Sequence, residues 1–283
     1  MPTFETPQPI SVGLELGVGD IRIEASDRPQ TVVEVTPSDP GRKADIAAAE
    51  QTTVEHANGH LSVQGPSGWR QWHPRKGSGS IQVRIAVPTG SSVSAEVGVA
   101  TLRGRGRLGA CRYEAGVGDV HLDESGSLEV KLGAGDATVE RAAGTVNVVT
   151  RSGDVRIGSI QGSGVVKNSN GDTWIGEVTG EARVRAANGT ISVDRAHQGV
   201  VAKTANGAIR LGEVERGAAV AESAFGDLEV GIRDGVSAWL DLHTKLGQVR
   251  NDLDASDSPG PGEDTVEVHA STSMGDILIR RSA

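Results

Sequence analysis

The chain has 283 residues, a formal net charge of −9 and an aromatic content of only 2%. This acidic balance argues against a general attraction to nucleic acid or anionic membranes, because both need clustered lysine and arginine. The sequence shows no signal peptide and no apolar run approaching the roughly 18 residues that span a membrane, and its single cysteine, Cys111, excludes an intramolecular disulfide. We therefore expect a cytoplasmic protein without membrane insertion.

The first part of the chain, residues 1–95, is predicted to be a β-rich cap. Long segments such as PISVGLELGVGDIRIEA (residues 9–25) and SIQVRIAVPTG (residues 80–90) alternate polar and apolar residues, as half-buried strands do. Only residues 44–51, ADIAAAEQ, have the alanine-rich composition of a short helix. We expect this part to cover an open end of the repeats that follow.

Between two of these strands lies GPSGWRQWHPRKGSGS, residues 65–80, the one concentrated basic and aromatic segment of this acidic chain. Tryptophan and cationic side chains suit the buried contacts of a protein interface. The alternative is that the tryptophans fold back onto the cap while the charges stay solvated. The candidate partner-binding residues are Trp69, Arg70, Trp72, His73, Arg75 and Lys76.

From residue 96 onward a turn phrase of the form x-G-D recurs at a nearly constant spacing. Its glycines return about every 18 residues, and a fixed short period is the signature of a repeat architecture. The second and fourth residues after each glycine are mostly aliphatic, which predicts a half-buried strand, and a second short strand leads to the next turn. These glycines are Gly118, Gly135, Gly153, Gly171, Gly189, Gly207 and Gly226.

No single repeat can bury its apolar side chains alone, so like strands must stack on like strands. Layers about 4.8 Å apart then build an all-β fold, a parallel β-solenoid over residues 96–283. In this arrangement Val155, Thr173, Ile191 and Ile209 are expected to share one buried column. The acidic, Pro- and Gly-rich segment 252–264 interrupts the last repeats.

The turn positions themselves carry polar residues. Asparagine and glycine tolerate the positive φ of a tight corner, and stacked amides can hydrogen-bond along the axis. These considerations apply to Asn170, Asn188 and Asn206, which precede the turn glycine in consecutive repeats. We interpret the aspartates that follow the glycine as acceptors for turn amides, and a calcium-binding column is the weaker alternative. They are Asp119, Asp136, Asp154 and Asp172.

The phrase V-P-x-G followed by reiterated S-G-D-V-x-I motifs, beginning with IAVPTGSSVSAEVGVATLRGRGRLGACRYEAGVGDVHL (residues 85–122), resembles a bacterial family of β-strand-repeat proteins called "putative adhesins" of unknown function. The likeness covers most of the chain. It implies a single-stranded, right-handed parallel β-helix and no catalytic residue set.

Three other patterns have plain structural interpretations. Residues 104–109, GRGRLG, match the letters of a dinucleotide-binding fingerprint, but strand-like sequence follows where that motif needs a helix. The arginines in and beside it, Arg103, Arg105, Arg107 and Arg112, are expected to form a solvated turn edge. His56 and His60 make a weak metal pair, and Cys111 lacks the context of a nucleophile.

Two classes of function remain. Parallel β-helices include polysaccharide-degrading enzymes that use clustered carboxylates, and Glu177, Asp194 and Glu213 near one strand end are the candidates for such a carbohydrate-binding or carbohydrate-degrading protein. We favour a non-enzymatic scaffold or protein-interaction module without a cofactor. Its partner would be another protein or a second copy, bound at residues 65–80 or at an uncapped C-terminal coil.

Overall fold

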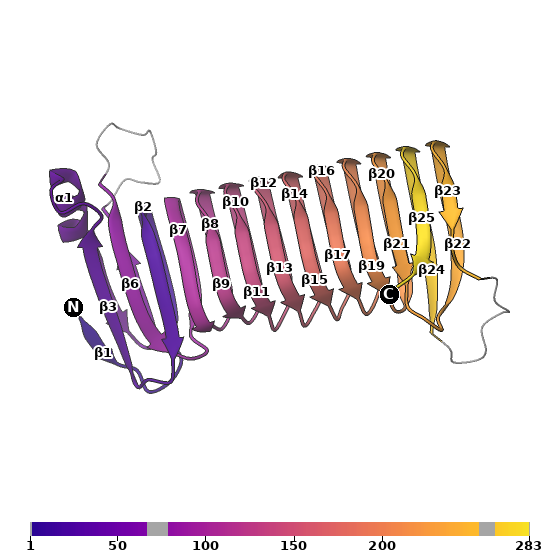
Figure 1. Cartoon of the computed structure of the whole chain (residues 1–283). Helices are drawn as coiled ribbons and strands as arrows, with labels where there is room; N and C mark the ends of the chain where they lie inside the picture. The colour runs from indigo at the N-terminus through magenta and orange to yellow at the C-terminus, as the bar shows by residue number, and fades with distance from the viewer. Residues whose placement is uncertain (1, 67–78, 255–263, 283) are drawn as a thin grey trace. The chain divides into compact units, whose positions relative to one another are not determined.

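The computed structural model describes residues 2–66, 79–254 and 264–282 (Figure 1). The chain is almost entirely β, and the described part contains one short helix, α1 (Lys43–Gln51). It divides into two compact units, Met1–Ala143 and Gly144–Ala283. Both are built from parallel strands that stack in successive coils, so the prediction of a β-solenoid is confirmed. A cap boundary at residue 95 stays a prediction.

The described part of the first unit contains α1 and eleven strands. Parallel strands form its stack, and shorter antiparallel strands lie at its N-terminal side. The strands are β1 (Thr3–Glu5), β2 (Ser11–Ser26), β3 (Gln30–Pro37), β4 (Thr53–Ala57), β5 (His60–Gln64), β6 (Ile81–Pro88), β7 (Ser92–Arg107), β8 (Cys111–Val117), β9 (Val120–Ser125), β10 (Leu128–Ala134) and β11 (Ala137–Ala142).

Strand β2 lies inside the stack of the first unit although it is nearly the first strand of the chain. It pairs in parallel with β5 and β6 on one side and with β7 on the other. Strand β3 runs antiparallel to β6, and β4 runs antiparallel to β5. The segment between β2 and β7 therefore folds back to cover the outer side of β2.

The described part of the second unit contains fourteen strands in coils of two, and a bend at the turn glycine joins the two strands of a coil. They are β12 (Val146–Ser152), β13 (Val155–Ile160), β14 (Gly164–Asn170), β15 (Thr173–Val178), β16 (Ala182–Asn188), β17 (Ile191–Ala196), β18 (Val200–Asn206), β19 (Ile209–Val214), β20 (Gly217–Phe225), β21 (Leu228–Ile232), β22 (Ser237–Leu246), β23 (Val249–Asn251), β24 (Thr265–Met274) and β25 (Ile277–Arg281).

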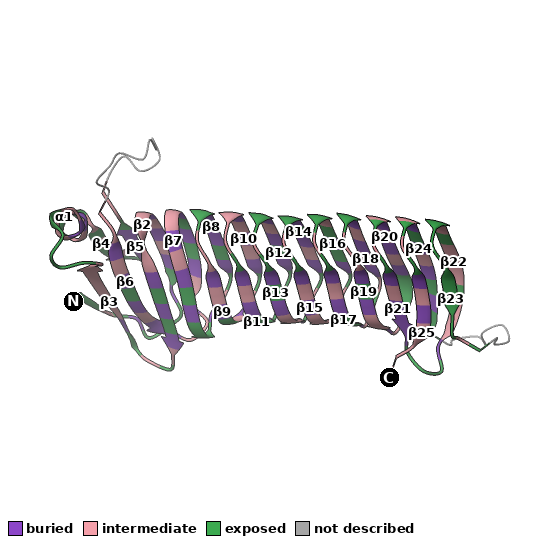
Figure 2. Cartoon of the chain, turned by 45° about the horizontal axis from the view of Figure 1, so that its top comes forward, coloured by how far each residue is buried: buried purple, intermediate pink, exposed green. Residues whose placement is uncertain are grey.

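The core of the second unit consists of straight columns of side chains between its two sheets. Val155, Thr173, Ile191 and Ile209 are direct partners in successive strands, and each is no more than 1% exposed. The predicted column is therefore confirmed. Figure 2 shows buried and less buried residues alternating along these strands, as a period of two requires.

The last coil in space is not the last coil in sequence. Strand β24 pairs in parallel with β20 on one side and with β22 on the other, and β25 lies between β21 and β23 in the same way. The coil formed by β22 and β23 therefore ends the stack of the second unit, although β24 and β25 follow it in the chain (Figure 1).

The bend between the two strands of a coil depends on glycine. The seven turn glycines have φ between +131° and +148°, where an L side chain is strained. Space is also lacking, since a Cβ at Gly171 would lie 2.2 Å from the carbonyl oxygen of Gly153 in the neighbouring coil. Glycine is thus required both by the backbone conformation and by the close approach of stacked coils.

We expect Gly189→Ala to lower the free energy of unfolding by about 3 kcal/mol or more, because strain adds to a clash. The new Cβ would lie 2.1 Å from the carbonyl oxygen of Gly171. The matched control is Gly59→Ala, which also has positive φ (+73°) but nothing within 4 Å, and should cost about 1–2 kcal/mol. Urea unfolding followed by circular dichroism measures both, and equal losses would contradict the role of close approach.

We expect Thr173→Val to raise the free energy of unfolding by about 1 kcal/mol, because it removes a buried hydroxyl that has no hydrogen-bond partner among the described residues. The control is Thr272→Val, since the Thr272 hydroxyl donates to the carbonyl of Gly226 at 3.1 Å and its loss should not stabilise. The same unfolding assay applies, and a destabilised Thr173→Val would show that the hydroxyl is not costly.

Candidate functional site

The basic and aromatic loop predicted to bind a partner lies mostly outside the described residues. Trp69, Arg70, Trp72, His73, Arg75 and Lys76 all fall there, so their role stays a prediction. The structure does describe where the loop returns to β6. The carboxylate of buried Asp45 in α1 accepts hydrogen bonds from the backbone N–H groups of Ser80 (3.0 Å) and Asp39 (3.2 Å). The helix therefore fixes this end of the loop.

The turn asparagines form a ladder of side-chain amides. Nδ2 of Asn188 donates to Oδ1 of Asn170 at 2.8 Å, and Nδ2 of Asn206 donates to Oδ1 of Asn188 at 2.9 Å. Their expected place at positive φ is wrong, because Asn58 is the only non-glycine residue of the described chain with positive φ. The glycine alone takes the bend, and the asparagines end the strands before it.

The turn aspartates form a second ladder with backbone amides. Oδ1 of Asp119 accepts from the N–H of Asp136 at 3.0 Å, and Oδ1 of Asp154 accepts from the N–H of Asp172 at 2.8 Å. Oδ1 of Asp172 accepts from the N–H of Thr190 at 2.7 Å. The described residues also contain no group of three or more His, Cys, Asp and Glu placed to hold a metal. The geometry favours the amide-acceptor interpretation over calcium.

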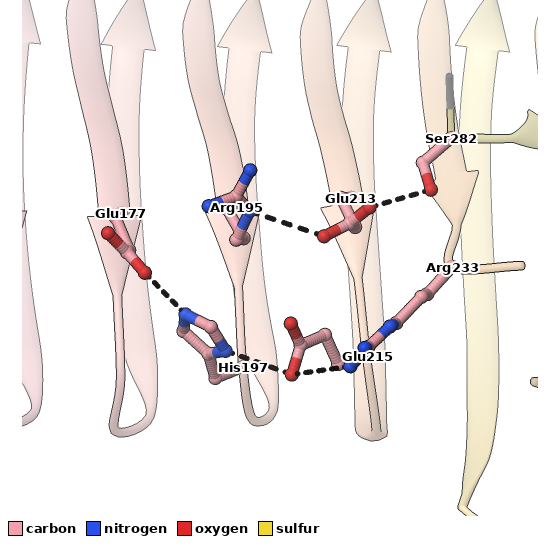
Figure 3. A network of polar contacts seen from close by, with 7 residues as sticks. All are labelled: Glu177, Arg195, His197, Glu213, Glu215, Arg233 and Ser282. Atoms are coloured by element: carbon pink, nitrogen blue, oxygen red, sulfur yellow. Dashed lines mark hydrogen bonds and ion pairs between the residues drawn. The ribbon is translucent and has the colours of Figure 1, made fainter.

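Two of the three carboxylates considered for catalysis are bound by other side chains. Asp194 accepts a hydrogen bond from the indole N–H of Trp174 at 3.0 Å. Glu213 forms an ion pair with Arg195 at 3.2 Å and accepts a hydrogen bond from the hydroxyl of Ser282 at 2.8 Å (Figure 3). Both carboxylates therefore take part in contacts with neighbouring side chains.

The third carboxylate, Glu177, belongs to a charged network centred on His197. Nε2 of His197 is 2.6 Å from Oε1 of Glu177, and its Nδ1 is 2.9 Å from Oε2 of Glu215. Glu215 also pairs with Arg233 at 3.4 Å (Figure 3). Hydrogen bonds to Glu177 and then to Glu215 raise the pKa of His197 above its usual value. When the ring is protonated, it donates from Nε2 to Glu177 and from Nδ1 to Glu215. We call this network of Glu177, His197, Glu215 and Arg233, which links adjacent coils, the clasp.

Three members of this network, His197, Glu215 and Arg233, were not predicted from the sequence although their spacing carries a signal. They lie one repeat period apart, as do Glu177 and Arg195, so opposite charges recur with the spacing of the coils. Residues at that spacing are neighbours in adjacent coils, and Glu177 is the direct partner of Arg195. A search for opposite charges one period apart would have found the clasp.

The weaker chemical candidates have ordinary structural roles. The ring of His56 packs against Phe4 at a centroid distance of 5.0 Å, whereas Nδ1 of His60 lies 2.6 Å from the hydroxyl of Ser11. Cys111 is buried, and burial raises its pKa to about 12. Its thiolate is therefore scarce, and the geometry does not favour a nucleophile.

The GRGRLG segment does not open a helix. Its first four residues end β7, and β8 begins at Cys111, so the phosphate-binding helix of a dinucleotide site is absent from this described segment. The expectation of a turn edge is also wrong, because Arg107 ends β7 and Arg112 lies within β8. Arg103 and Arg105 lie further inside β7, since the strand continues parallel to β2 as far as Arg105.

The last three coils in the stack of the second unit, which contain β20, β24 and β22, expose apolar side chains to solvent. Phe225, Met274 and Leu246 are direct partners in neighbouring strands and are 54%, 49% and 63% exposed. They continue the column that Asn206 occupies one coil earlier. Trp239 on β22 is 58% exposed. Exposed apolar residues thus follow one another across the last three coils of this stack.

The repeat pattern and the fold point to one family, and a comparison with family models decides it. The model for Toastrack DUF4097 matches residues 11–280. The chain belongs to the Toastrack DUF4097 family. A search of curated proteins gave no significant match. In the described part of this Toastrack chain, no helix is both long and apolar enough to cross a membrane.

Solved structures similar to this Toastrack chain share little sequence with it. A protein described as a "putative adhesin" from Bacteroides fragilis is 12% identical, with 99% of this chain and 95% of that chain covered and a TM-score of 0.41. A "putative lipid binding protein" from Parabacteroides distasonis is 13% identical over 99% and 95% of the two chains, with a TM-score of 0.35. A "putative adhesin" from the same species is 13% identical over 98% and 95%, with a TM-score of 0.31.

The clasp predicts a pH-dependent stability. Because the pKa of His197 is raised in the folded chain, its stabilisation is complete below the unfolded pKa near 6.5 and is lost as the pH rises through the folded pKa. We expect His197→Gln to cost about 0.5–1 kcal/mol near pH 6, the size of a partly exposed ion pair, and less near pH 9. Urea unfolding at both pH values measures this.

The control for that experiment is His121→Gln, since His121 makes no ion pair among the described residues. It should show no comparable difference between the two pH values. A cost of His197→Gln that stays the same or grows as the pH rises would contradict the clasp.

Proposed function

We propose that the chain is a non-enzymatic interaction module whose terminal coil, β22–β23, pairs with the same coil of a second copy. The carboxylates considered for catalysis support the non-enzymatic part, because Glu177, Asp194 and Glu213 each engage a neighbouring side chain. The observation that supports association is the open edge of the terminal coil.

The edge is open in two senses. In the described chain β22 pairs only with β24, and β23 only with β25, so the outer backbone groups of the coil have no strand beside them. Inward-facing side chains are also incompletely covered, since Leu240 and Leu242 are half-buried while their partners Val268 and Ala270 are at most 1% exposed. Such an edge is a template for another strand.

The sequence of β22 suits pairing with its own copy. Two copies of one strand related by a two-fold axis pair antiparallel and present the same surface to each other. In a register centred on His243, Asp241 of each copy would lie opposite Lys245 of the other. These opposite charges favour the pairing, and the exposed Trp239 and Leu246 would lose contact with water.

Two further predictions belong to this proposal. The loop at residues 65–80 would supply a separate contact for a protein partner through Trp69 and Trp72. A cytoplasmic location agrees with a single cysteine, Cys111, which forms no disulfide within the chain. Cell fractionation would test the location.

Sedimentation velocity of the full chain tests the pairing. We expect a dimer at about 50 µM that dissociates on dilution, and Lys245→Glu should weaken it at least roughly tenfold because a carboxylate then faces Asp241. Reversing both charges, Asp241→Lys with Lys245→Asp, should restore the dimer.

The matched control is Lys167→Glu, the same charge change at an exposed position of β14 with no ion pair in the described chain. It should leave the dimer intact. The proposal would be contradicted if the wild-type chain stayed monomeric at that concentration. It would also be contradicted if Lys245→Glu and Lys167→Glu weakened the dimer equally.

A further inference from the structure

An arginine-lined groove lies on the outer face of the first unit. Its volume is about 670 Å³, and strands β3, β6, β2 and β7 contribute to its lining. These four strands are neighbours in the sheet. Five arginines line it, but only two carboxylates, Glu24 and Glu34. The arginines are Arg22, Arg28, Arg84, Arg103 and Arg105. The groove is thus cationic in a chain whose net charge is −9.

Three of these arginines are forced into a row by strand register. Arg22 on β2 is the direct partner of Arg84 on β6 and of Arg103 on β7. Neighbouring strands are about 4.8 Å apart, so three like charges lie side by side on one face. Like charges directly opposite each other destabilise a sheet unless anions compensate them.

The protein supplies only part of that compensation. Arg84 pairs with Glu34 at 3.3 Å, and Arg103 pairs with Asp20 at 3.0 Å. Asp20 is also 3.8 Å from Arg22, so one carboxylate serves two guanidinium groups. Acidic partners are therefore fewer than the arginines of the row.

The remaining two arginines have no ion pair among the described residues. Nε of Arg28 is buried and lacks a hydrogen-bond partner in the described structure. A buried donor without a partner is costly, and a ligand that accepts from it would recover that cost. Arg105 follows Arg103 by two residues on β7, so both side chains lie on the same face of the sheet.

The lining indicates which chemistry fits. A guanidinium group presents a planar fork of N–H donors that matches the two oxygens of a carboxylate or phosphate. The groove has an apolar floor that includes Val32 and Ala86, and none of its described lining residues is aromatic. Stacking of bases or sugar rings is therefore not provided. Its volume falls in the range of small-molecule sites.

We propose that this groove binds a small organic polyanion carrying two or more carboxylate or phosphate groups, held by Arg22, Arg28 and Arg105. Arg22 and Arg105 lie on neighbouring strands two residues out of register, so a ligand with separated anionic groups can reach both. Arg28 would donate to the ligand from the side of the groove formed by the turn between β2 and β3. This site is independent of the pairing edge proposed above.

Isothermal titration calorimetry of the full chain tests the groove with two probes, citrate and myo-inositol hexakisphosphate, at physiological ionic strength. We expect at least one probe to bind with one site per chain. Binding of citrate alone would identify carboxylates as the preferred groups, and binding of the hexakisphosphate alone would identify phosphates. Both outcomes support an oxyanion site, whereas failure of both probes at millimolar concentration would overturn it.

Arginine variants distinguish binding at this groove from a general attraction of anions to positive charge. Arg28→Gln with Arg105→Gln should weaken binding at least about tenfold, because charge-assisted hydrogen bonds are lost, while the folded chain loses no described ion pair. Arg105→Lys keeps the charge but loses the planar fork, so it should retain only part of the affinity. The control is Arg183→Gln with Arg185→Gln, two exposed arginines on β16.

The control removes the same net charge from the second unit and should change the affinity less than about twofold. Circular dichroism verifies that each variant is folded. Equal weakening by the two double variants would show attraction to overall charge and would overturn the proposal, as would an Arg28→Gln and Arg105→Gln variant that binds like the wild type.

Discussion

The close approach of backbone to backbone where coils bend is the constraint on which the rest of the structure depends. Parallel strands in neighbouring coils are about 4.8 Å apart, and the bend of one coil lies against the bend of the next. A Cβ at Gly207 would lie 2.0 Å from the carbonyl oxygen of Gly189, so no side chain fits. Once glycine fixes the bend, the residues on either side are placed in register. The asparagine ladder, the aspartate ladder and the aliphatic core columns all follow from that alignment.

The same alignment explains which features could be predicted from the sequence. The period of the turn glycines and the alternation after them are local signals, so the column from Val155 to Ile209 could be placed from the order of residues alone. The order of the coils was not accessible in this way. Nothing in β24 and β25 marks them as the strands that enter between earlier coils, because any aliphatic repeat can stack on any other. The conformation of the turn asparagines was wrongly predicted for a related reason. Asparagine and the glycine after it can both adopt positive φ, and only the packing of the bend shows that the glycine does so.

Long-range register also explains why the charged features were harder to foresee. Arg22, Arg84 and Arg103 belong to segments outside the regular period, and only the return of β6 and β7 to the two sides of β2 sets them in a row. By contrast, the clasp around His197 follows the period of the coils and could have been predicted from the spacing of opposite charges in the sequence. In the regular repeats, residues one period apart in the sequence are therefore neighbours in space. Outside the regular repeats, the neighbours depend on the order in which the strands pair, which the spacing does not reveal.

The interleaved order of the last coils has a consequence for how the chain folds during synthesis. During synthesis β22 and β23 emerge before β24 and β25, yet their native neighbour in the stack is this later pair. The nascent chain must therefore either leave the earlier coil unattached or let it rest provisionally on β20 and β21, to be displaced afterwards. Completion of this unit therefore waits for β24 and β25 to emerge, and a chain cut short before β24 would leave the β22–β23 coil without its native neighbour.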